Sequence, residues 1–126
     1  MTTTLPEQLH RILAIRLDNI GDVVMTSPAL RALKAAYPGA HLTLMASPAG
    51  SQVAPLLPWV DDLITWRSIW QELNPGAEFT AEREHELVAL LQQGQFDAAF
   101  IFTSFSQSPH PPAFSCYLAG IFIRVG

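Results

Sequence analysis

The sequence has one cysteine, few basic residues and no long apolar run, and each shortage excludes a class of protein. Cys116 alone cannot form an internal disulfide framework, which agrees with a reducing compartment. The seven Lys and Arg residues are scattered and the net charge is −4, which argues against a nucleic-acid partner. No stretch reaches the roughly 18 apolar residues of a membrane-spanning helix, and the start lacks a signal-peptide pattern. We therefore expect a cytoplasmic protein, with a peripheral position at the inner membrane face still compatible.

Patterns for metals and common cofactors are missing as well. The histidines at positions 10, 41, 85 and 110 are far apart and have no cysteine partners at ligand spacing. Neither the G-x-G-x-x-G spacing of dinucleotide sites nor a phosphate-binding P-loop occurs. The sequence therefore predicts neither a metal site nor a resident cofactor.

What the chain does contain is an alternation of short apolar segments and helical patterns. Hydrophobic residues make up 49% of the 126 residues and charged residues only 14%, enough for one folded domain over 11–126 after a loose leader over 1–10. The alternation predicts an α/β fold: a Rossmann-like, doubly wound parallel sheet of about five strands in the order 3-2-1-4-5. Strands are expected over 11–17, 41–46, 62–66, 96–102 and 121–125, and helices or helical turns over 23–37, 52–57, 80–93 and 113–119.

The start of the first helix has two interpretations because of Pro28. Either Asp22 caps the helix and Pro28 kinks it, or Ser27 caps a helix that has Pro28 at its first position.

Sheets of this order bind ligands at the switch point between the first and fourth strands, which selects two loops. In the first, Asp18, Asn19 and Gly21 are candidates for substrate binding, and Asp22 could act as a general base on a hydroxyl group. The structural alternative is that Asp22 is a helix cap and Asp18 a turn residue.

The second loop, 103–112, offers hydroxyl groups, one amide and an imidazole for binding a sugar or a phosphate. Its candidates are Thr103, Ser104, Ser106 and His110, and the alternative is an ordered proline-rich connection. A triad of Ser104, His110 and Asp22 has no G-x-S-x-G elbow to support it.

Three tryptophans, Trp59, Trp66 and Trp70, lie close together in the sequence. They could form a sugar-stacking platform, or they could pack in and around the core.

Two segments resemble a known family. Residues 12–40 contain Gly21-Asp22 and then Thr26-Ser27-Pro28-Ala29-Leu30 after an apolar strand, and residues 117–126 contain Leu-Ala-Gly-Ile followed by Arg124 and Gly126. Both are similar to segments of the ADP-heptose:lipopolysaccharide heptosyltransferases of glycosyltransferase family 9. The two segments span almost the whole chain in the order found in that family.

The resemblance implies the N-terminal, acceptor-side half of a two-domain GT-B fold. In that family the aspartate matching Asp22 is the general base of an inverting, metal-free transfer. A nucleotide-sugar donor such as ADP-heptose is expected only with the C-terminal domain. We expect that domain to be absent from this chain and the chain alone to be inactive. Asp18-Asn19 replaces the serine-rich loop of the best-known heptosyltransferases, which leaves open an acceptor other than lipopolysaccharide core.

The partners expected are a glycan or glycolipid acceptor and a second copy of the chain, because a truncated domain leaves apolar surface uncovered. The residues also leave open a stand-alone module that binds a nucleotide or sugar phosphate without catalysis, and a remnant of a longer gene. A receiver-type signalling domain is excluded, because the third strand ends in Thr65-Trp66 and the lone lysine, Lys34, lies on the first helix.

Overall fold

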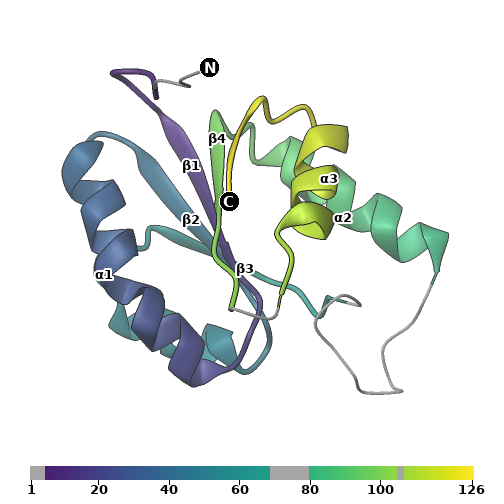
Figure 1. Ribbon diagram of the computed structural model, residues 1–126, viewed down its shortest axis with the longest axis horizontal. Helices are drawn as coiled ribbons and strands as arrows, with labels where there is room; N and C mark the ends of the chain where they lie inside the picture. Colours follow the sequence, from purple (N-terminus) through teal and green to yellow (C-terminus); the bar gives the residue numbers. More distant parts are fainter. Residues whose placement is uncertain (1–4, 69–79, 105–106) are drawn as a thin grey trace.

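A five-stranded parallel sheet lies between two layers of helices (Figure 1). This computed structural model describes residues 5–68, 80–104 and 107–126. The strand order is β3-β2-β1-β4-β5, which confirms the predicted Rossmann-like, doubly wound sheet. The strands are β1 (Arg11–Arg16), β2 (His41–Ala46), β3 (Asp62–Thr65), β4 (Ala98–Ile101) and β5 (Ile123–Val125); the helices are α1 (Ile20–Ala36), the 3₁₀ helix η1 (Gly50–Leu56), α2 (Ala81–Gln93) and α3 (His110–Leu118).

The central strand β1 supplies both halves of the core because successive side chains point to opposite faces of a strand. Ile12 and Ala14 join the apolar cluster beneath α1 and η1. Leu13 and Ile15 join the cluster beneath α2 and α3. All four side chains are buried, as expected for a strand covered on both faces.

Helix α1 begins earlier than either predicted start. Asn19 is its N-cap, and the Asn19 side chain accepts a hydrogen bond from the Asp22 amide at 3.1 Å. Pro28 lies inside the helix, so the carbonyl of Val24 has no amide partner four residues on. Val24 and Pro28 are both exposed, so water can donate a hydrogen bond to the Val24 carbonyl in place of the missing amide. The expectations that Asp22 or Ser27 caps the helix were therefore wrong.

The described part of the expected leader is held against the domain. Leu9 is buried in the core cluster, and the Tyr37 hydroxyl donates a hydrogen bond to the carbonyl of Pro6 at 3.0 Å. The Asp97 carboxylate accepts from the amides of His10 and Arg11 at 2.6 and 2.9 Å. These contacts fix the chain where it enters β1.

Trp66 packs in the core, as the packing alternative proposed. It is buried, and the Arg83 guanidinium lies over its ring at 4.5 Å from the centroid. Trp59 is half-buried, and Trp70 lies outside the described residues. The tryptophans therefore give no support to a stacking platform in the described parts of the chain.

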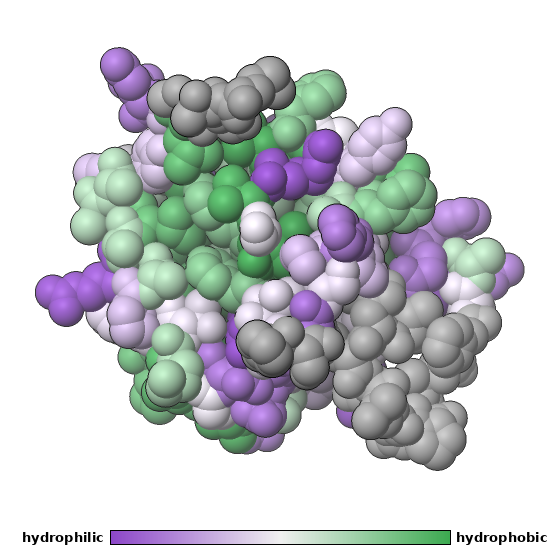
Figure 2. Space-filling view, in the orientation of Figure 1, coloured by the Kyte–Doolittle hydropathy of each residue, from purple (hydrophilic) through white to green (hydrophobic). Residues whose placement is uncertain are grey.

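One side of the sheet is only half covered. Helix α1 packs over β1 and contacts η1, while no described helix lies over β4 and β5 on that side (Figure 1). An apolar groove of about 330 Å³ occurs there, and Figure 2 shows apolar surface on this face of the molecule. The groove is lined by Leu5, Ala29, Ala32, Leu33, Ala36, Tyr37, Phe100 and Phe102.

Candidate functional site

The loops after β1 and β4 lie side by side at the carboxyl edge of the sheet. β1 and β4 are hydrogen-bonded neighbours, and the Phe102 amide extends the pairing to the carbonyl of Ile15 at 2.9 Å. From this edge one connection enters α1 and the other enters α3, on opposite faces of the sheet. This is the predicted switch point, where doubly wound sheets bind ligands.

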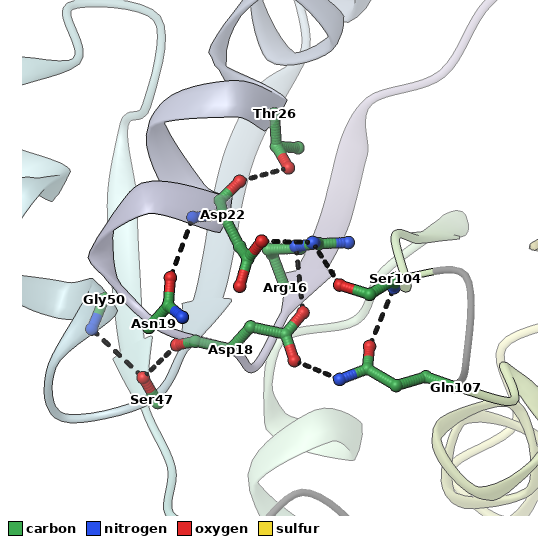
Figure 3. Close-up of polar contacts among 9 residues, drawn as sticks. All are labelled: Arg16, Asp18, Asn19, Asp22, Thr26, Ser47, Gly50, Ser104 and Gln107. Atoms are coloured by element: carbon green, nitrogen blue, oxygen red, sulfur yellow. Dashed lines mark hydrogen bonds and ion pairs between the residues drawn. The ribbon is translucent and has the colours of Figure 1, made fainter.

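A buried arginine, Arg16, holds these loops together (Figure 3). Its Nε lies 3.0 Å from Asp18 Oδ2, and its Nη2 lies 3.1 Å from Asp22 Oδ1 and donates to Ser104 Oγ at 2.9 Å. The contact with Asp18 is an ion pair without an aligned hydrogen bond. Because one guanidinium faces two carboxylates, the cluster has a net formal charge of −1.

Gln107 completes the connection between the two loops. Its side-chain amide donates to Asp18 Oδ1 at 2.5 Å, and its side-chain oxygen accepts from the amide of Ser104 at 2.8 Å. Asp18 thus has one oxygen on Gln107 and one beside Arg16, and its side chain is only 7% exposed. Asp18 is therefore largely occupied by the protein itself.

A third loop, after β2, is tied to the first through Ser47. The Ser47 hydroxyl donates to the carbonyl of Asp18 at 2.6 Å and accepts from the amide of Gly50 at 3.0 Å. Gly50 is required here, because a Cβ on it would lie 2.7 Å from Val23 Cγ2. This close approach brings η1 against the start of α1.

The three loops enclose a polar cavity of about 360 Å³, within the size range of small-molecule sites. Asp22 lies in the first turn of α1, where the helix dipole favours a negative charge, and its side chain is 31% exposed. The cavity therefore combines one accessible carboxylate with amide and hydroxyl groups, which suits a ligand rich in hydroxyl groups. It is lined by Leu17, Asp18, Asn19, Asp22, Ser47, Ala49 and Gln107.

The other predicted site residues have different positions. Ser104 is held by Arg16 and Gln107 next to the cavity, and Thr103 is half-buried and does not line it. Gly21 lies in the first turn of α1, where a Cβ would meet only Asn19 Oδ1 at 3.4 Å, so the backbone itself does not need a glycine. Ser106 lies outside the described residues.

The prediction that His110 lies in a loop was wrong. His110 is the first residue of α3, and it is exposed. Pro111 and Pro112 follow it in the first turn, where proline is tolerated because those amides need no helical partner. No hydrogen bond joins His110 to Ser104, so the Ser104, His110 and Asp22 triad is not assembled.

Three residues of the site were missing from the sequence-based candidates: Arg16, Ser47 and Gln107. Arg16 was assigned to a buried strand, although a charged residue at the last position of such a strand indicates a partner nearby. Ser47 is the first residue after β2, and β2 ends beside the last residue of β1, so its place at the carboxyl edge of the sheet was the available signal. Gln107 was considered only as the one amide of the second loop and was not chosen as a site residue.

In residues 5–68, 80–104 and 107–126, no three His, Cys, Asp or Glu side chains gather as a metal site would require. Over the same ranges, no helix is both long and apolar enough to cross a membrane.

No protein-family model and no curated protein sequence matches the chain. Solved structures do match. Glycosyl transferase family 9 from Veillonella parvula is 20% identical with a TM-score of 0.70, over 97% of this chain and 32% of that one. ADP-heptose LPS heptosyltransferase II from E. coli is 25% identical with a TM-score of 0.63, over 90% of this chain and 29% of that one.

The fold also occurs in a protein of different chemistry. The C-terminal domain of a hydrogenase from Pyrococcus furiosus is 17% identical with a TM-score of 0.54, over 98% of this chain and 95% of that domain. The fold alone therefore does not define the activity. The chain spans about a third of the length of the two glycosyltransferases. Its fold and its two motif segments together make it a glycosyltransferase-like domain similar to part of the proteins of glycosyltransferase family 9.

Proposed function

We propose that this chain is the acceptor-binding domain of an inverting glycosyltransferase, with Asp22 as the general base. The observation that carries the proposal is the position of Asp22: an accessible carboxylate at the switch point, in a cavity lined by amide and hydroxyl groups. The acceptor is a cell-envelope glycan or glycolipid, and the sugar is a heptose or a related sugar from a nucleotide-sugar donor. The heptosyltransferase from E. coli supports this choice.

In the proposed reaction, an acceptor hydroxyl lies against the open oxygen of Asp22. The hydroxyl oxygen bonds to the anomeric carbon of the donor while the bond from that carbon to the phosphate oxygen breaks. The nucleotide diphosphate leaves with the electron pair, and Asp22 takes the proton. This chain spans about a third of the two glycosyltransferases, so we propose that it binds acceptor but does not transfer sugar alone. Asn19 and Ser47 would orient the acceptor.

The test is an NMR titration of this chain with ADP-sugars and with candidate acceptor glycans at neutral pH. We expect acceptor-induced shifts at the Asp22 and Gly50 amides and at the Gln107 side-chain amide, with no response to nucleotide. Asp22→Asn should alter the response, whereas Asp62→Asn, an exposed carboxylate at the start of β3, should leave it unchanged.

Two outcomes would contradict the proposal. Nucleotide binding at the same loops would favour a stand-alone module that binds a nucleotide or sugar phosphate without catalysis. Sugar transfer by this chain alone would contradict the proposed division between acceptor and donor binding.

We also propose that the chain forms a homodimer through its uncovered apolar surface, and that it works at the inner face of the membrane. Phe122 is 89% exposed and directly precedes the free edge strand β5. It lines a second groove, which shares Leu5 with the groove beside α1. Sedimentation velocity over a hundredfold concentration range should show a dimer that Phe122→Asp weakens. A monomer throughout would contradict dimerisation.

A further inference from the structure

The guanidinium of Arg16 lies at the point where three segments of the site meet. It contacts Asp18 in the first loop, Asp22 on α1 and Ser104 after β4, and its side chain is 9% exposed (Figure 3). An arginine offers five donors in a rigid fork, so it can fix several acceptors at once.

The two carboxylates that contact Arg16 differ in whether an oxygen is left open to a ligand. The side chain of Asp18 is buried, and both its carboxylate oxygens face protein groups, since Gln107 donates to Oδ1 and Arg16 lies beside Oδ2. Asp18 balances the buried charge of Arg16, which would otherwise be costly.

Asp22 contacts Arg16 through Oδ1 only. Its Oδ2 makes no hydrogen bond to any described residue, and its side chain lines the cavity. An aspartate in the first turn of a helix can occupy several staggered rotamers when nothing holds it. The contact with Arg16 selects the one in which Oδ1 is held and Oδ2 stays open.

We propose that Arg16 is a positioning residue for Asp22, and that Asp18 and Gln107 act through Arg16 rather than on the ligand. The inference rests on the proposed function, because it concerns the carboxylate assigned there as the base. It assigns Asp18, a substrate-binding candidate from the sequence, to the support of the arginine.

The test measures the rotamer of Asp22 in the chain without any ligand. The probe is the pair of three-bond couplings from the backbone nitrogen and the carbonyl carbon to Asp22 Cγ, which report χ1. The variant Arg16→Gln with Asp18→Asn removes both charges together, so no unpaired buried charge remains. The matched control is Lys34→Gln with Asp61→Asn, which removes the ion pair at 2.6 Å between α1 and the residue before β3.

We expect one Asp22 rotamer in the unaltered chain and in the control. In the Arg16 and Asp18 variant, the other rotamers should rise roughly fivefold in population, the change expected when an ion pair at the upper end of the range for partly exposed pairs is lost. A folded variant in which Asp22 keeps its single rotamer would overturn the inference.

A second variant covers the case in which the first does not fold. Arg16→Lys keeps the charge and loses the fork, so Asp22 should again populate several rotamers while the fold is retained. An unchanged Asp22 in Arg16→Lys would count against the inference in the same way. Neither coupling measurement uses a glycan, so it can fail or succeed independently of the acceptor titration.

Discussion

Replacing Ser47 with alanine should destabilise the chain although it removes only one oxygen atom. The Ser47 side chain is buried, and its hydroxyl is the hydrogen-bond partner of both the Asp18 carbonyl and the Gly50 amide. Alanine would leave two backbone groups without that partner, each at a cost of about 1–3 kcal/mol when buried. Gly50 is buried while Asp18 is half-buried at the edge of the cavity, so we expect a total of about 2–3 kcal/mol.

Urea unfolding followed by circular dichroism is the suitable assay. With an m-value of about 2 kcal/mol per molar urea, the midpoint should fall by about 1–1.5 M at unchanged m. Ser51→Ala is the matched control, because its hydroxyl accepts only an exposed bond from Thr65, and it should change stability by less than about 0.5 kcal/mol. A Ser47→Ala midpoint within error of the control would refute the role assigned to this hydroxyl.

Two further predictions concern residues away from the site. The pKa of Asp97 lies below its ordinary value of 3.8, because burial, which raises it, is outweighed by hydrogen bonds from the amides of Arg11 and His10. The contribution of the Asp97 carboxylate to the free energy of unfolding is therefore full above about pH 4 and is lost as the pH falls through the lowered pKa. Asp97→Ala should cost about 1–2 kcal/mol in urea unfolding at pH 7 and less at pH 3, and an equal cost at both would contradict this. Burial raises the pKa of Cys116 to about 12, although the nearby charge of Arg124 acts in the opposite direction. A thiol reagent at pH 8 should therefore label Cys116 only when urea unfolds the chain, and rapid labelling of the folded chain would contradict the buried position.

The sheet could be predicted from the sequence, but the contacts within the site could not. Strands such as 96–102 contain almost no polar residue, and that pattern is local, so the order of the elements follows from it. The prediction of where α1 starts was wrong because three residues in that region can cap a helix. Only the folded structure shows that Asn19 is the cap. The loops of the site were found from the strand order. The bonds that join them, from Arg16 to Ser104 and from Gln107 to Asp18, link residues nearly ninety positions apart, which no local pattern records.

The hydrogen bonds between the first and fourth strand loops also determine when the site can form. Arg16 bonds to a residue 88 positions away and Asp18 to one 89 positions away. Contacts of such separation form only after a long loop has closed, which slows folding and places these contacts late in it. During synthesis, Asp22 leaves the ribosome long before Ser104 and Gln107 exist, so Asp22, the proposed base, lacks part of its surroundings until the fourth strand has joined the first. Signals from Arg16 and Gln107 would therefore make a sensitive probe of the completed fold, reporting the last step of folding rather than the first.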